Sequence, residues 1–549
     1  MNKNLLEQLK PLDLSSIDSI DSSIAQTLRF LLNAVEELIA ENQQLREEIQ
    51  KLKDENNRLK AEQARPTIGP QKKDGDISSE TERNTTKSKG TRAKRKPLKI
   101  DRIEHCKVDR LILPDDAIKK GVEKSIIQDM DFKVHITEFH REVYYSPSEK
   151  KRYVGKLPPG YKGEFGPGVK SLVCVLYHDG NVSEPGIVRL LNSSGLDISA
   201  ATVSRILTDE TSVFHQEKRA IFEAGLQSSQ GHHIDDTSAR VNGKNYYVHV
   251  LCNPFYTAYF TRAKKDRLTI LELLSPEGLR FRCDLESIEL MKTFGLSEKQ
   301  RSRLIEHVSD DLLRQEEMNG ILTELFPNAN KQVSNRRIIL ESCAVTAYPH
   351  RADAINILVC EDAPQFKNIT ELLGLCWVHE GRHYKKLRPF LPLHQRLLDK
   401  FLSSLWEYYH ELLLYKVSPN PVQAEVFSEG FDHLFGQKTG YDVLDARIEK
   451  TQKKKSQLLL VLDYPAIDLH NNSAELGARA QARKRDVSLQ TKSQAGTQAK
   501  DAFMTVVQTA KKLGVNILDY MKDRFGQAYA MTSLADLIRE HSQTTTDTS

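Results

Sequence analysis

The stretch His232–Thr261, HHIDDTSARVNGKNYYVHVLCNPFYTAYFT, decides the fold of this 549-residue chain. An apolar and histidine lead-in precedes two adjacent acids, Asp235 and Asp236. Two further runs of β-branched and aromatic residues follow at Asn245–Leu251 and Phe255–Thr261, with turn residues between them. This pattern predicts three successive strands of an antiparallel meander, with an acid on the first strand.

The composition is that of a protein with several domains and ordinary polarity. A chain of 549 residues is longer than a single domain usually is, and it can bury a large core. Hydrophobic residues make up 39% and charged residues 28%, which is typical of soluble protein with some long exposed helices. Because the formal net charge is only +4, affinity for nucleic acid would have to come from local patches.

The seven cysteines are scattered and form no Cys-x-x-Cys pair. This spacing argues for reduced thiols in a cytoplasmic setting, and against a disulfide framework or a cysteine-rich zinc module. The first residues contain no apolar signal core, and no run of about 18 apolar residues occurs anywhere. We therefore expect a soluble, cytoplasmic protein that does not enter a membrane.

Residues 28–59, within an N-terminal segment 1–63, form a heptad repeat. The d positions hold Leu31, Leu38, Leu45, Leu52 and Leu59, and the a positions hold Leu28, Val35, Asn42, Ile49 and Asn56. Strict seven-residue spacing predicts a left-handed coiled coil, and asparagine at a favours two parallel strands. We expect a homodimer or a higher oligomer through this helix. The alternative is one amphipathic helix that packs on its own protein.

Residues 64–99 lose this periodicity, and their composition predicts a disordered basic linker. From residue 87 onward the linker contains no acid and includes the triplet Lys94, Arg95 and Lys96. Such a run neutralises DNA phosphates without reading sequence, or else it is only a solvated tether. Both interpretations stay open.

Residues 100–170 are predicted to be a small strand-rich module. Extended runs occur at Phe132–Phe139, Glu142–Tyr145 and Lys151–Val154. The Pro/Gly-rich segment Leu157–Gly168 closes the module.

Residues 171–225 are predicted to be helical and to contain a helix-turn-helix. The first helix starts at Ser183-Glu184-Pro185, and a turn at Ser193-Ser194-Gly195 precedes a second helix over Ser199–Leu207. The polar face of the second helix suits contacts with a DNA groove or phosphates, and it consists of Ser199, Thr202, Ser204 and Arg205. The alternative is an ordinary helical hairpin that packs against the next domain.

A second and a third acid follow in settings that suit a metal site. The apolar run Ala354–Cys360 predicts a buried strand, and Asp362 follows it directly after Glu361. A surface turn is the alternative for Asp362. Glu475 lies in the first turn of a predicted helix, because Asn471, Asn472 and Ser473 before it are N-cap candidates.

Basic residues follow Glu475 on the same helical face, at Arg479 and Arg483. An acid with arginines along one stripe can bind metal at one end and a phosphate backbone at the other. Glu475 alone could also be an acid that only favours the helix dipole. Further helices are predicted at Ala499–Leu513 and Ile517–Phe525, and a polar tail from Glu540 is predicted to be disordered.

The segment Leu372–Tyr384, LLGLCWVHEGRHY, has two interpretations. Cys376, His379 and His383 share one helical face, which is compatible with zinc, but no partner pair of ligands is near. The favoured interpretation has the helix pack its apolar side inward and offer Arg382 and its histidines to DNA phosphates or to the site.

The chain resembles transposases of the insertion sequence 66 family, which are DDE-type enzymes. The resemblance rests on HIDDT (233–237), CWVH (376–379) and HNNSAE (470–475) followed by Arg479, and in character it extends over most of residues 1–525. Carried over position by position, it implies the catalytic and metal-binding triad Asp235, Asp362 and Glu475. The family's cysteine-rich zinc segment has no counterpart here, because residues 100–170 lack those cysteines.

The resemblance implies a multidomain α/β protein with a ribonuclease-H-like catalytic core at 226–525. Helical insertions would lie at about 272–340 and 377–455, with a C-terminal tail at 526–549. Two Mg²⁺ or Mn²⁺ ions about 3.5–4 Å apart would support strand cleavage and strand transfer on double-stranded DNA. The implied setting is the bacterial cytosol and nucleoid, with possible accessory proteins of the same element. The alternatives are a non-catalytic DNA-binding regulator derived from a transposase, and a nuclease of the same fold.

Overall fold

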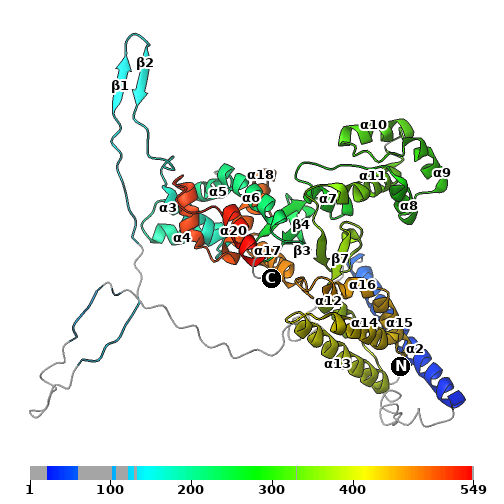
Figure 1. Ribbon diagram of the computed structural model, residues 1–549. Helices are drawn as coiled ribbons and strands as arrows, with labels where there is room; N and C mark the ends of the chain where they lie inside the picture. The colour runs from blue at the N-terminus through cyan, green and yellow to red at the C-terminus, as the bar shows by residue number, and fades with distance from the viewer. Residues whose placement is uncertain are drawn as a thin grey trace, which may run out of the picture.

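The computed structural model describes residues 22–59, 100, 102–106, 122–128, 133–209, 211–328 and 330–546. It is a mixed α/β structure, mostly helical, built around a five-stranded mixed sheet (Figure 1). The basic triplet at 94–96 lies outside the described residues. Among the described residues, no helix combines the length and the apolar character that crossing a membrane requires.

The sheet begins with the predicted meander and continues with two parallel strands. Its strands are β3 (Gly231–Val241), β4 (Lys244–Cys252), β5 (Thr257–Arg262), β6 (Ile357–Cys360) and β7 (Leu372–Leu375), in the order β5-β4-β3-β6-β7. The first three pair antiparallel, which confirms the meander, whereas β6 pairs parallel with both β3 and β7. The buried strand expected at 354–360 is β6. Strand β7 was not predicted, because it leads directly into the helical segment of Leu372–Tyr384.

The turn between β3 and β4 fixes the register of the meander. Asn242 and Gly243 both have positive φ angles, 46° and 74°, as a type I′ turn requires. Asparagine and glycine are the residues that adopt this conformation at least cost. The turn pairs Val241 with Lys244, and this pairing sets Asp235 opposite Val250.

A helix closes the outer edge of the sheet. Helix α18 (Gln494–Lys512) presents Asp501, Thr505 and Thr509 at four-residue intervals, about 6 Å apart along a helix. Their side chains accept hydrogen bonds from the outward amides of β5, Thr509 from the amide of Thr257 at 3.2 Å and Asp501 from that of Thr261 at 2.7 Å. Alternate strand residues are about 6.6–6.8 Å apart, so the two repeats nearly match. The edge strand is therefore not available for pairing with another chain.

Two helical regions interrupt the sheet-forming segments. Between β5 and β6 lie α7 (Arg267–Leu273), α8 (Leu285–Thr293), α9 (Glu298–Arg301), η3 (Ser302–His307), α10 (Gln315–Leu325), α11 (Val333–Ala347) and η4 (Tyr348–His350). After β6 comes η5 (Pro364–Phe366). After β7 lie α12 (Trp377–Lys385), α13 (Pro392–Tyr415), α14 (Pro421–Gly436), α15 (Asp442–Gln452), α16 (Lys455–Leu458) and η6 (Leu460–Leu462). The helical character predicted for both regions is therefore present.

The described residues after the sheet end in helices, where a disordered tail was predicted. After α17 (Asn472–Ser488) and α18 come α19 (Ile517–Phe525) and α20 (Leu534–Thr546). The predicted disorder from Glu540 is wrong as far as residue 546. Leu534 and Ile538 are one helical turn apart and fully buried in the main core, so they anchor α20, and its polar second half continues the helix.

The two helices predicted for the helix-turn-helix are present before the sheet. The helices in this region are α3 (Pro167–His178), α4 (Glu184–Ser193), α5 (Ala200–Thr208) and α6 (Ser212–Gln227). The Ser199 hydroxyl caps α5 by accepting from the amide of Thr202 at 3.2 Å. Val203 and Ile206 bury the inner face of α5 in the main core, whereas Ser199 and Arg205 are exposed. The apolar face of α5 thus packs as in the alternative interpretation, and its polar face stays open to solvent.

The N-terminal helix α2 (Ser22–Leu59) has two different faces. Asn33 and Glu36 attach it to its own protein, since Glu36 accepts hydrogen bonds from the amides of Phe390 and Leu391. The leucines at d positions point elsewhere: Leu31, Leu38, Leu45 and Leu52 are each at least 50% exposed. The side chains of residues 56 and 59 lie outside the described ones.

Within the described part of 100–170, strands occur only in one hairpin, β1 (Val143–Ser146) and β2 (Lys151–Val154). Its residues are almost all exposed, and it projects from the rest of the chain (Figure 1). The extended run predicted at 132–139 forms no strand over 133–139, because no strand of the described residues pairs with it.

We predict that Gly477→Ala destabilises the protein, because α17 packs directly on β4 at this glycine. A Cβ at residue 477 would lie 2.7 Å from a methyl carbon of Val250, closer than packed carbon atoms can approach. We expect a loss of about 1–3 kcal/mol in denaturant unfolding. Gly320→Ala in α10 is the matched control, because no atom lies within 4 Å of its Cβ. It should stabilise by up to about 1 kcal/mol. Equal effects of the two changes would contradict close packing at Gly477.

Candidate functional site

The acids predicted to form a site lie on or just after the inner strands β3 and β6 and at the start of α17. Asp235 is on β3, two residues beyond the pairing of His233 with Val359 on β6. Glu361 and Asp362 directly follow β6, and Glu475 lies in the first turn of α17. Because β3 and β6 are parallel, their chains leave the pairing region in the same direction, which brings Asp235 beside Glu361.

A buried asparagine holds these segments together. Asn471 is fully buried, and its amide donates to the carbonyl oxygen of Ile234 at 2.8 Å and accepts from His233 Nδ1 at 3.1 Å. Its backbone amide donates to Cys376 Sγ at 3.2 Å, and its carbonyl accepts from the amide of Glu475 at 3.0 Å. One residue thus fixes β3, the start of α12 and the start of α17.

Asn471 does this instead of the capping role predicted for it. It occupies the N-cap position of α17, but its side chain makes no capping hydrogen bond. The sequence signal for a polar residue at the helix start was correct in position. The side chain of Asn471 instead contacts His233 and Ile234, which are 238 and 237 residues away in sequence. No local pattern could reveal such contacts.

The carboxylates at the site repel one another. Burial raises the pKa of Asp235 to about 7, and the charges of Glu361, Asp236 and Glu475 add to this effect. Burial also raises the pKa of Glu361, and so do the charges of Asp236 and Glu475, against Lys265 and Arg382. A buried group of acids whose charged forms are this unfavourable would gain from a bound cation.

The second acid has two candidates. Asp362 Oδ1 lies 2.7 Å from Lys367 Nζ, and Oδ2 lies 2.7 Å from Lys454 Nζ. Burial alone would raise the pKa of Asp362, but hydrogen bonds from these two lysines outweigh it and lower the pKa. Asp362 is thus held by cations, whereas Glu361 is the acid whose charge acts most strongly on Asp235. Asp362 stays a prediction, and Glu361 is a second candidate, which the sequence pattern alone does not single out.

Asp236 has hydrogen-bond partners of its own, although its charge acts on both Asp235 and Glu361. Lys265 Nζ donates to its Oδ1 at 3.2 Å, and Gln365 Nε2 donates to its Oδ2 at 2.9 Å. Adjacent residues of a strand point to opposite faces, so Asp235 and Asp236 cannot both face Glu475. The resemblance implies Asp235 rather than Asp236, and this assignment stays a prediction.

Helix α12 contributes a histidine and an arginine to the site. His379 lies 3.6 Å from both Glu361 and Glu475, measured from its Nε2 and Nδ1. Arg382 donates to Glu475 Oε2 at 3.3 Å and contacts His379 Nε2 at 3.0 Å. Arg382, predicted to contact DNA, therefore lies against an acid of the site. Arg479 and Arg483, predicted to do the same, lie exposed along α17.

The donor set allows a comparison of two kinds of metal. Among the described residues, the one group of three ligand atoms within 4.8 Å of one another is Cys376, His379 and Glu475. Asp235, Asp362 and Glu475 do not form such a group, and His383 does not belong to the one that exists. Burial raises the pKa of the Cys376 thiol to about 11, which disfavours the thiolate that zinc needs. The oxygen donors of Asp235, Glu361 and Glu475 fit Mg²⁺ or Mn²⁺ in chemistry and charge.

Comparison with known proteins assigns no family. The chain is 29% identical, over 323 residues, to the uncharacterized protein y4jO of Sinorhizobium fredii (strain NBRC 101917 / NGR234). The matched region covers 58% of this chain and 99% of that protein. No protein-family model matches the chain, and no solved structure gives a significant match.

We predict that Asp235→Asn stabilises the metal-free protein at neutral pH. The folded pKa of about 7 lies above the ordinary 3.8, so between these values the folded chain keeps a proton that the unfolded chain releases. The wild type therefore loses stability as pH rises from 4 to 7, and the loss persists above pH 7. Asparagine removes this loss and can still accept the hydrogen bond from the amide of Asp236.

In a chelator-containing buffer at pH 8 the variant should be more stable by about 2–4 kcal/mol, and the gain should vanish near pH 4. Denaturant unfolding at both pH values measures the difference. Added Mg²⁺ should stabilise the wild type more than the variant. A variant that is no more stable than wild type at pH 8 would show that burial and the neighbouring acids do not destabilise the charged form of Asp235.

Proposed function

We propose that this protein is a DDE-type DNA transposase. In this proposal it binds element ends and cuts and joins DNA by metal-dependent phosphoryl transfer. The observation that carries the proposal is the meeting of Asp235, Glu361 and Glu475, whose charges act on one another beside the adjacent parallel strands β3 and β6. The strand order β5-β4-β3-β6-β7 supports a ribonuclease-H-like core, a fold that places its first metal-binding acid on the first strand.

The site's own residues supply binding and orientation. Asp235 and Glu475, with one acid of the 361–362 pair, would hold the cation. When bound, divalent ions activate the attacking oxygen and stabilise the leaving oxygen. Arg382 and His379 hold the Glu475 carboxylate in place from α12. Asn471 keeps β3 and α17 at a fixed spacing, so the acids are positioned before DNA arrives.

The remaining predicted contacts suit a long, negatively charged substrate. The exposed Arg479 and Arg483 extend from the site along α17, and the polar face of α5 is open to solvent. Arginines on a helix face bind backbone phosphates by charge and by forked hydrogen bonds. In this proposal α17 lies along the DNA backbone next to the reacting phosphate.

We predict that Asp235→Asn and Glu475→Gln abolish cleavage and joining of labelled duplexes taken from the DNA that flanks the coding sequence. Losing a ligand of the cation should lower the cleavage rate by roughly a thousandfold. Asp236→Asn is the control and should retain activity, because Asp236 is bound to Lys265 and Gln365. Glu361→Gln and Asp362→Asn, measured beside them, identify the second acid.

The same assay separates this proposal from its alternatives. Cleaved products without joined ones would indicate a nuclease, and DNA binding without either product would indicate a regulator. Cleavage by Asp235→Asn and Glu475→Gln at the wild-type rate would contradict the assignment of the site.

Assembly through α2 is part of the proposal, because its leucine stripe is exposed in the single chain. We predict that the double variant Leu38→Glu, Leu45→Glu converts a dimer or larger oligomer into a monomer. Both side chains are at least 50% exposed, so the change should leave the fold intact. Light scattering gives the mass, and circular dichroism gives the helix content. Leu414→Glu, at a leucine that is 63% exposed on α13, is the control. A monomeric wild type would overturn this part of the proposal.

A further inference from the structure

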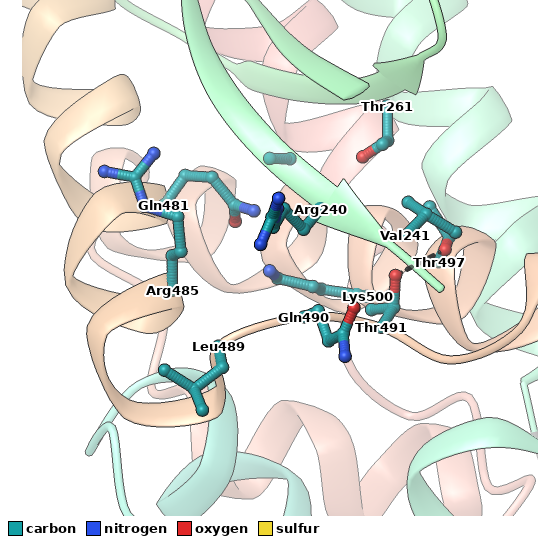
Figure 2. Close-up of a pocket in the computed structure, with 11 residues that line it drawn as sticks. Arg240, Val241, Thr261, Gln481, Arg485, Leu489, Gln490, Thr491, Thr497 and Lys500 are labelled. Atoms are coloured by element: carbon teal, nitrogen blue, oxygen red, sulfur yellow. Dashed lines mark hydrogen bonds between the residues drawn. The ribbon is translucent and has the colours of Figure 1, made fainter. Parts of the chain in front are cut away.

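A hollow lined by cations lies beside the sheet, away from the acids. It is formed by the end of β3, the C-terminal end of α17, the segment 489–491 and the first turns of α18. Three of its lining residues are cationic, Arg240, Arg485 and Lys500, and none is acidic. Figure 2 shows Lys500 reaching into the hollow toward Arg240. A surface of this kind attracts an anion.

Of the three cations that line the hollow, Lys500 is the one whose charged form burial disfavours. Burial lowers its pKa to about 8, and the positive charge of Arg485 acts in the same direction, against Asp501. Asp501 is engaged elsewhere, because both its oxygens accept from Thr261, at 2.7 and 2.8 Å. Among the described residues no acid forms an ion pair with Lys500 or Arg240. A desolvated, unpaired cation aimed into a hollow would gain from a bound anion.

The rest of the hollow is held rigidly. Arg485 donates to the carbonyl oxygen of Ser238 at 2.5 Å and to its hydroxyl at 2.8 Å, which fixes the guanidinium against β3. The amide of Asn242 donates to the carbonyl of Thr491 at 2.8 Å, and the amide of Thr491 donates to the carbonyl of Arg240 at 3.2 Å. The hairpin tip and the segment after α17 are thus fastened together around the hollow.

The backbone is strained where α17 ends. Leu489 has φ 56° and ψ −64°, and the amide of Gln490 donates to the carbonyl of Ser488 at 2.6 Å. This is a γ-turn with positive φ, which a side chain such as leucine rarely adopts. The turn directs Gln490 back to the hairpin, where its Oε1 accepts from the amide of Gly243 at 2.7 Å. Such strain persists only where the surroundings fix the conformation.

We infer that this hollow binds a phosphate group through Lys500, Arg240 and Arg485. The side-chain amide of Gln481, which also lines the hollow, suits the oxygens of a phosphate that the cations attract. If the proposed function holds, the phosphate belongs to the DNA backbone. Glu475 and Arg485 are about ten residues apart on one helix, or about 15 Å, roughly four backbone steps of B-form DNA at about 3.4 Å.

The test compares Lys500→Gln and Arg240→Gln with the control Lys492→Gln, an exposed lysine that does not line the hollow. Binding of a labelled random duplex of about 30 base pairs is measured by anisotropy over a salt series. Each pocket variant should weaken binding several-fold and reduce the slope of log K against log salt by about 1, whereas the control should not. Thermal unfolding checks that each variant folds.

A second arm distinguishes the source of the phosphate. Inorganic phosphate is added at constant ionic strength, and the melting temperature is compared with that in chloride. If phosphate stabilises the wild type but not Lys500→Gln, and the two proteins bind the duplex equally well, the hollow is a site for a free phosphate. This result would overturn the DNA assignment. No effect of the pocket variants in either arm would overturn the inference while the wild type still binds DNA. A wild type that binds no DNA would instead overturn the proposed function.

Discussion

The side-chain amide of Asn471 is the contact on which the geometry of the site depends. It is fully buried, and it joins the main chain of β3 to the start of α17 while its backbone amide contacts Cys376. A buried amide with unsatisfied donors or acceptors is costly, so these partners must stay in place in the folded protein. The spacing of Asp235 and Glu475 follows from this contact.

The charges around that contact would favour a bound cation. Asp235 and Glu361 are partly buried beside further acids, which raises the pKa of both carboxyls. Asp362, one residue further on, is neutralised by Lys367 and Lys454. Two lysines thus neutralise Asp362, whereas the negative charges of Asp235 and Glu361 are not fully balanced by cations. Unbalanced charge away from solvent lowers the stability of a protein, and such destabilising arrangements are common at functional sites.

The meander, the strand at β6 and most helices could be predicted, because each depends on local periodicity. The Asn-Gly turn at 242–243 and the caps at Ser183 and Ser199 are local signals of the same kind. The capping of β5 by α18, the role of Asn471 and the position of Glu361 could not be predicted. Each is a contact between segments that are distant in sequence. Helix α20 was missed because its apolar residues, among them Leu534, Ala535 and Ile538, all lie in its first half and its second half is polar.

Diffraction from crystals of the full chain soaked in Mn²⁺, recorded at the manganese absorption edge, tests the central claim most directly. The account predicts an anomalous peak bounded by carboxylate oxygens of Asp235 and Glu475, with Glu361 or Asp362 completing the site. The absence of a peak there, or a peak only beside Cys376 and His379, would contradict it.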